Sequence, residues 1–187
     1  MTFRKIAYRW VLFGALALAC AIGARAMPVQ SPDSDEISKL LVEAKSHAIL
    51  AENDAAELDS FARTRITWES HAHKLRNIRE HVNELGKVCK ELSDLRAQGS
   101  PWQQTAIDQI DPLLREMAHQ LTVTINHLND NQSRVHMQEY RDYAHANYEV
   151  AVRTAQVIRD FVDYDETKSK AGDLEAKLNI AIPYKDE

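Results

Sequence analysis

The sequence predicts an all-α protein: an up-down-up-down antiparallel four-helix bundle, preceded by a cleaved signal peptide and followed by a short polar helix. Apolar residues recur every three or four positions through four segments of about 30 residues each. Glycine and proline are scarce beyond residue 26 and, apart from Gly86 and Pro112, fall at the breaks or in the tails. Helices of matched length joined by short connections favour antiparallel neighbours.

The first 26 residues have the three-part pattern of a secretory signal peptide. Three basic residues precede an apolar run of 15 residues (10–24), which ends in an A-x-A cleavage signal at 24–26. The run is shorter than the roughly 20 residues that a membrane span needs. We therefore expect cleavage after Ala26 and a secreted or periplasmic protein. The alternative is an uncleaved segment that anchors the chain, which would be its only contact with a membrane.

Removal of residues 1–26 makes the chain strongly acidic. Residues 27–187 carry 19 Lys and Arg against 28 Asp and Glu, a net charge of −9. Such a chain is repelled by phosphate backbones and by anionic lipid surfaces, so we expect no nucleic-acid partner. Cys89 is the single cysteine of this range, so no internal disulfide can form and packing alone must stabilise the fold.

The first helical segment is expected over 35–64, after a flexible tail at 27–34. Asp33 and Glu36 have the spacing of a capping box. Spacings of four and three keep the apolar residues on one face. These residues are Ile37, Leu41, Ala44, Ala48, Ala51, Ala55, Leu58 and Ala62.

The second segment is expected over 68–97, and the break after it is the clearest in the chain. Gly99 suits a helix end, Ser100 the next N-cap and Pro101 the first helical position, and Gln103 completes a capping box with Ser100. The connection at 64–67 carries neither Gly nor Pro. A single helix of about 60 residues through both segments is therefore the alternative to a turn there.

The third segment is expected over 101–128, with Pro112 kinking it or splitting off its first turns. A polar turn at 129–133 separates it from the fourth segment, expected over 134–163. These segments complete the predicted bundle, 35–163. Residues 164–187 lose the apolar stripe, and we expect a loosely packed polar appendage there. Its short helix would be supported by the pairs Glu166/Lys170 and Asp173/Lys177.

Most motif-bearing enzyme classes lack their motifs in this chain. It has no H-E-x-x-H, no G-x-S-x-G, no C-x-x-C-H and no Walker or Rossmann glycine pattern. Three glycines beyond residue 26 are too few for a loop that cradles phosphate. We therefore expect a protein that is not an enzyme.

Three of the eight histidines make up the candidate metal site. If the helices pair antiparallel about turns near 66, 100 and 132, then His71, His127 and His136 fall in one layer of the bundle. Imidazoles at one level can bind Zn²⁺ or Cu²⁺, or act as a pH switch near pH 6. The plainer interpretation is three unrelated histidines at the edge of a core.

The function that these observations favour is a secreted or periplasmic helical bundle that acts through protein–protein contacts in the cell envelope, without a cofactor. The alternative is a bundle that binds a zinc or copper ion, or haem, through His71, His127 and His136. The sequence does not identify the protein partner, and it leaves open a homodimer.

Overall fold

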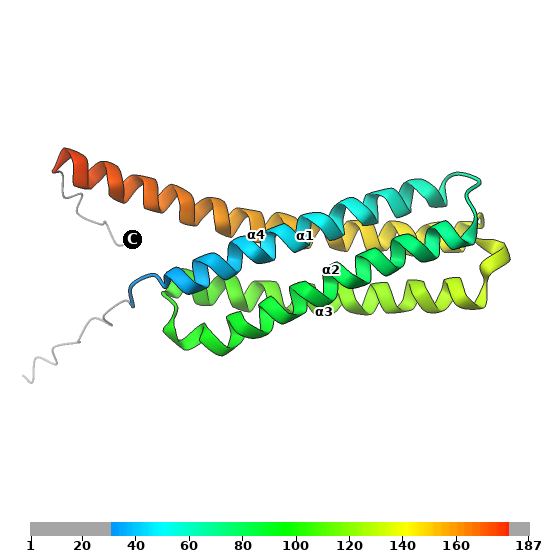
Figure 1. Cartoon of the computed structure of the whole chain (residues 1–187), viewed down its shortest axis with the longest axis horizontal. Coiled ribbons are helices and arrows are strands. Elements are labelled where there is room, and N and C mark those ends of the chain that lie inside the picture. Colours follow the sequence, from blue (N-terminus) through cyan, green and yellow to red (C-terminus); the bar gives the residue numbers. More distant parts are fainter. Residues whose placement is uncertain (1–30, 180–187) are drawn as a thin grey trace, which may run out of the picture.

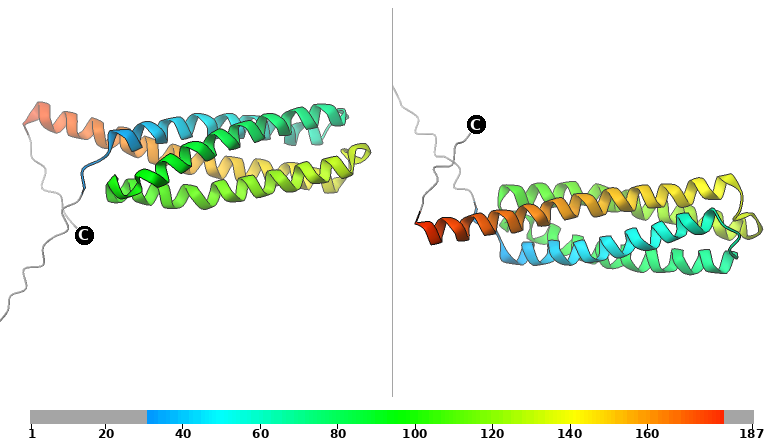
Figure 2. Two further views of the ribbon diagram at one scale, coloured as in Figure 1. Left: turned by 60° about the horizontal axis from the view of Figure 1, so that its bottom comes forward. Right: turned by 90° about the horizontal axis from the view of Figure 1, so that it is seen from above.

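Four α-helices make up the computed structural model, which describes residues 31–179 and has no strand within them (Figure 1). α1 spans Asp35–Ala62, α2 Trp68–Leu95, α3 Pro101–Asp130 and α4 Gln138–Leu178. Short 3-10 helices, η1 (Arg96–Gln98) and η2 (Gln132–Arg134), lie in the last two connections. Consecutive helices run in opposite directions beside one another (Figure 2). The all-helical prediction is confirmed; the predicted signal peptide lies outside the described residues.

The core consists of two clusters, one in each half of the bundle. All eight apolar residues that the sequence places on the face of the first segment are buried. Five of them are alanines, whose small side chains let a neighbouring helix approach closely. Within the described residues no helix has the length and apolar character needed to cross a membrane.

A turn separates α1 from α2, so the alternative of one continuous helix is wrong. α1 ends at Ala62, and its last carbonyls accept hydrogen bonds from Arg63 and Thr64. Thr67 then takes an extended conformation at the N-cap of α2. Burial of the two apolar faces against each other closes the hairpin without a glycine or proline.

The spacing of Asp33 and Glu36 predicts a capping box at the start of α1, but the N-cap is Ser34. The Ser34 hydroxyl accepts a hydrogen bond from the backbone N–H of Ile37 at 3.4 Å. Asp33 instead accepts a hydrogen bond from the indole N–H of Trp102 at 2.7 Å. The predicted capping box at Ser100 and Gln103 is present.

Pro112 does not split α3, which continues through it from Pro101 to Asp130. α4 differs more from the prediction, because it begins at Gln138 instead of 134 and continues to Leu178 instead of ending near 163. Residues 163–171 contain no helix breaker, and Glu166 and Lys170 form the predicted ion pair at 3.5 Å. The polar appendage is therefore, up to Leu178, the end of α4 itself.

Candidate functional site

Two of the three predicted histidines meet at one tyrosine. Nδ1 of His71 on α2 lies 3.2 Å from the hydroxyl of Tyr140 on α4. The ring of His127, near the end of α3, stacks on the ring of Tyr140, with 6.1 Å between the two centroids. The structure thus brings His71 and His127 to one level, with Tyr140 as the residue that contacts both.

His136 does not join this cluster. It is exposed in the connection before α4, where it lines a pocket of about 410 Å³ with Arg65, Ile66 and Thr67. η2 occupies the end of the predicted turn at 129–133 and the first residue of the predicted fourth segment. α4 therefore starts only after His136. Among residues 31–179, no group of three or more His, Cys, Asp or Glu side chains is arranged to hold a metal ion.

His71 is the most buried ionisable group of the cluster. Its Nε2 has no hydrogen-bond partner, and the rings of Phe61 and Tyr140 meet it edge to face. Burial lowers the pKa of His71, and the nearby backbone carbonyl of Ile66 opposes this shift only in part. Burial also raises the pKa of the Tyr140 hydroxyl. The pair is therefore neutral near pH 7, and its hydrogen bond joins α2 to α4 inside the core.

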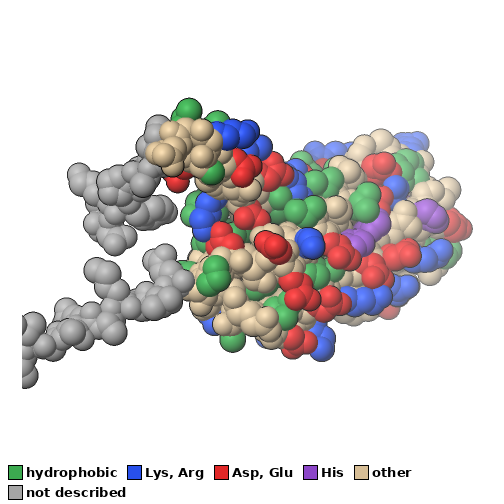
Figure 3. Space-filling model, turned by 60° about the vertical axis from the view of Figure 1, so that its left-hand side comes forward, with side chains coloured by type: hydrophobic (Ala, Val, Ile, Leu, Met, Phe, Trp, Pro, Cys, Tyr) green, Lys and Arg blue, Asp and Glu red, His purple; other side chains and the backbone are tan. Residues whose placement is uncertain are grey.

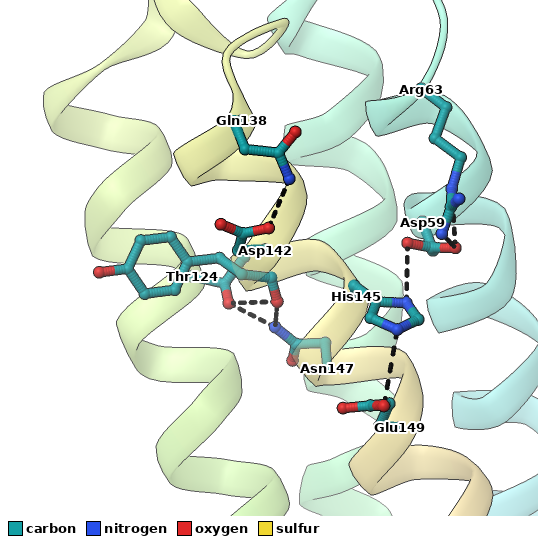
Figure 4. A network of polar contacts seen from close by, with 9 residues as sticks. Asp59, Arg63, Thr124, Gln138, Asp142, His145, Asn147 and Glu149 are labelled. Carbon is teal, nitrogen blue, oxygen red and sulfur yellow. Dashed lines mark hydrogen bonds and ion pairs between the residues drawn. The ribbon is translucent and has the colours of Figure 1, made fainter.

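Another histidine, His145 on α4, lies between two carboxylates on the surface (Figure 4). Its Nδ1 is 3.3 Å from Asp59 of α1, and its Nε2 is 3.5 Å from Glu149 one turn along α4. Asp59 also accepts a hydrogen bond from Arg63 at 2.8 Å. An Asp–His pair of this kind can position a base for catalysis, but no hydroxyl or thiol bonds to His145 among the described residues. The network links α1 to α4 by exposed ion pairs, which contribute little to stability.

On the other side of the same helix, Asn147 forms a buried polar contact with α3 (Figure 4). Its amide donates to the Thr124 hydroxyl, and to the Tyr143 carbonyl at 3.0 Å. Neither Asn147 nor Thr124 was predicted from the sequence as a site residue. The signal was available, since both interrupt apolar stripes at core positions, where a polar side chain needs a partner.

Cys89 is enclosed in the core and cannot act as an exposed nucleophile. It packs among the apolar residues of the cluster at the Trp102 end of the bundle. Burial raises its pKa to about 12, so the reactive thiolate is scarce at neutral pH.

The end of the bundle that carries Trp102 ties the start of α1 to α3 and α4. Asp33 accepts hydrogen bonds from the Trp102 indole and from the Lys168 ammonium, the second at 2.5 Å. Burial alone would raise the pKa of Asp33, but the hydrogen bonds from Lys168 and Trp102 hold it below its ordinary value. Tyr164 meets Trp102 edge to face, with 5.3 Å between ring centroids. Tyr164 and Lys168 thus fix this part of α4 to Trp102 and Asp33.

Beyond these contacts α4 projects past the bundle (Figure 1). No residue of α4 after Val162 is buried. At 1.5 Å per residue, the 41 residues of α4 extend about 61 Å, roughly 20 Å more than the 28 of α1. Six large apolar side chains are exposed among the described residues, and Tyr164, Leu174 and Leu178 of this end make up half of them.

A charged cleft opens where the projecting helix leaves α1. It has a volume of about 640 Å³, and Asp35 and Lys39 of α1 face Asp165 and Lys170 of α4 across it. Figure 3 shows this end of the molecule, where acidic and basic side chains lie interspersed and the end of α4 stands away from the other helices. The mixture of charges in this cleft defines no single class of small ligand.

Comparisons of the chain with protein-family models, with curated proteins and with solved structures found no match.

Proposed function

We propose that this chain is an exported, non-enzymatic, antiparallel four-helix bundle that acts through protein–protein contacts in the cell envelope, with the projecting end of α4 as its contact surface. We define this surface as residues 164–178. The observation that carries the proposal is the length of α4. It continues for about four turns after its last buried residue, Val162, and none of its residues from 163 to 178 is buried.

An exposed helix end of this kind needs an explanation, because an amphipathic helix is stabilised mainly by packing of its apolar face. Leu174 and Leu178 are 57% and 64% exposed. Two leucines one turn apart on an unpartnered helix suit the groove or the helix of another protein. The contacts of Asp33 and Trp102 occupy only Lys168 and Tyr164 at the start of this surface, and His145 lies elsewhere on α4.

Export is supported by the sequence of residues 1–26, and it implies an envelope or extracellular partner. N-terminal sequencing of the protein recovered from its own host tests this part. We expect the mature chain to begin at Met27. A chain that still begins at Met1 and sits in the membrane fraction would contradict cleavage.

Photo-cross-linking in the host tests the contact surface. A photoreactive amino acid is placed at Leu174 or Leu178, and in two matched controls at Val42 or Leu50. The controls are also large, apolar and exposed, but they lie on α1 within the bundle. We expect discrete cross-linked products from positions 174 and 178 and none from 42 and 50.

Two results would contradict the proposal. One is the absence of any product at 174 and 178. The other is the same products, in equal yield, at all four positions, because cross-linking would then reflect general exposure.

A further inference from the structure

We propose that the partner of this surface is a second copy of the chain, with residues 164–178 of the two copies pairing in parallel and in register. The inference rests on the proposed function, because it names the occupant of the same surface. It is carried by the spacing of the apolar residues and by the signs of the charges beside them.

The spacing is that of a coiled coil. Steps of three and four residues alternate along the projecting helix and place one stripe on it. The stripe consists of Tyr164, Thr167, Ala171, Leu174 and Leu178, all of which are exposed. The Thr167 hydroxyl donates to the Asp163 carbonyl at 2.7 Å, so its polar atom is satisfied within the helix and its methyl group is free to pack.

The charges beside the stripe are complementary to themselves. In coiled-coil notation Tyr164 and Ala171 are a positions, so Asp163 and Lys170 are g positions, and Lys168 and Glu175 are e positions. In a parallel pair, a g residue of one helix lies beside the e residue of the next heptad in the other. Asp163 then faces Lys168 of the second copy, and Lys170 faces Glu175 of the second copy.

An antiparallel pair would bring g positions beside g positions. Lys170 would then lie next to Lys177 of the second copy, and two such like-charge contacts would form by symmetry. The same arrangement brings the e positions together and places Lys168 beside Glu175 of the second copy, so its attractive and repulsive contacts are equal in number. In the parallel pair both charge contacts are attractive, which favours the parallel arrangement. Two heptads form a small interface, so the dimer is weak and depends on concentration.

Of the two charge pairs, Lys170 with Glu175 is the better one to mutate as a test of the dimer. Lys168 already bonds to Asp33 and lies 5.9 Å from the centre of the Trp102 ring. Among residues 31–179, the ion pair of Lys170 is an exposed one with Glu166 in its own helix, at 3.5 Å. An exposed ion pair contributes little free energy, so Lys170 can leave Glu166 and pair with a second copy with little loss of stability.

Sedimentation equilibrium tests the dimer, with the chain expressed with its own N-terminal segment. We expect a reversible monomer–dimer equilibrium that Lys170→Glu or Glu175→Lys weakens about tenfold, since each change creates two like-charge contacts by symmetry. The double variant K170E/E175K restores the pair with reversed signs and should recover the wild-type equilibrium. Leu174→Ser should abolish the dimer, while Leu50→Ser, on the exposed face of α1, should leave it unchanged.

Disulfide cross-linking tests the orientation. In a parallel, in-register pair, Thr167→Cys and Leu174→Cys should each give a covalent dimer on mild oxidation. An antiparallel pair has one symmetry centre and can cross-link at one of these positions at most.

A monomer at every concentration, or charge variants that behave as the wild type does, would overturn the second copy as partner. Failure of the two proposals is distinguishable by the mass of the photo-cross-linked product. Twice the mass of the chain supports self-pairing, and another mass replaces it with a different protein on the same surface. The absence of any cross-linked product at 174 and 178 would contradict the contact surface itself, and with it both proposals.

Discussion

The hydroxyl of Tyr140 lies 3.2 Å from Nδ1 of His71, and both side chains are buried between α2 and α4. Deletion of the hydroxyl in Tyr140→Phe keeps the ring and leaves His71 with both nitrogens unpaired in the core. We expect the free energy of unfolding to fall by about 1–3 kcal/mol, the usual cost of a buried unpaired polar group. Urea unfolding followed by circular dichroism measures this.

Tyr143→Phe is the control, because the Tyr143 ring contacts His127 (4.6 Å between centroids) but its hydroxyl is not part of the buried pair. It should change stability by less than about 0.5 kcal/mol. Equal losses of unfolding free energy in Tyr140→Phe and Tyr143→Phe would show that the hydrogen bond to His71 does not stabilise the fold.

The low pKa of His71 makes the fold sensitive to acid. In the folded chain this pKa is below its ordinary value of 6.5, so the unfolded chain binds the proton more readily. Stability is therefore highest above about pH 6.5 and falls as the pH drops below that value toward the folded pKa. His71→Gln removes the titration, so between pH 7 and pH 5 it should lose less stability than the wild type does.

His73→Gln is the matched control, since His73 is exposed on the same helix two residues away. It should keep the acid dependence of the wild type, measured by thermal unfolding across the same pH range. If H71Q and H73Q show the same dependence, His71 is not the group that couples pH to stability.

The histidine layer shows what could be predicted from the sequence and why the rest could not. Antiparallel pairing about short turns places His71 and His127 at one level, and the structure has both against Tyr140. The same arithmetic failed for His136, because η2 lengthens the third connection and delays the start of α4 to Gln138. A 3-10 turn depends on local backbone hydrogen bonds, which apolar periodicity does not reveal.

The core positions of α1 were predictable because burial imposes a regular period on them. The end of α4 was not, because no residue after Val162 is buried, so the buried apolar period that marks the other helices gives no sign of where this helix ends. The partner of Asp33 is a residue 69 positions away, Trp102, and only the tertiary fold brings them together.

Gln103 is expected to be the most important polar side chain at its end of the bundle. Its amide oxygen accepts from the backbone N–H groups of Ser34 at 2.9 Å and Ser100 at 3.1 Å, and its amide nitrogen donates to the Ser34 carbonyl at 2.9 Å. Gln103→Leu leaves the N–H groups of Ser34 and Ser100 without this acceptor, while the Ser34 carbonyl keeps the hydrogen bond from the Ser38 N–H at 3.0 Å, so we expect a loss of about 2–3 kcal/mol in urea unfolding.

Gln104→Leu, next along α3, removes only a hydrogen bond to the Gly99 carbonyl (2.8 Å) and should cost less than about 1 kcal/mol. A smaller loss for the Gln103 variant than for the Gln104 variant would contradict this ranking.

Cys89 should be inert in the folded protein. With its pKa raised to about 12 and its side chain buried, it should react with iodoacetamide at pH 8 only when the chain unfolds. Mass spectrometry of the labelled chain, with and without urea, measures this. Rapid labelling in the absence of urea would show that the second helix opens near Cys89 under native conditions.

Removal of metal ions should leave the protein unchanged if it acts through protein contacts. We expect the melting temperature to be the same with and without a chelator, since a metal bound only by the folded state would raise it. Differential scanning fluorimetry with EDTA and with added Zn²⁺ or Cu²⁺ measures this. A rise with either ion that disappears in both His71→Ala and His127→Ala would favour the metal-binding alternative. A rise that disappears only in His136→Ala would place the ion in the exposed connection before α4, away from the buried pair.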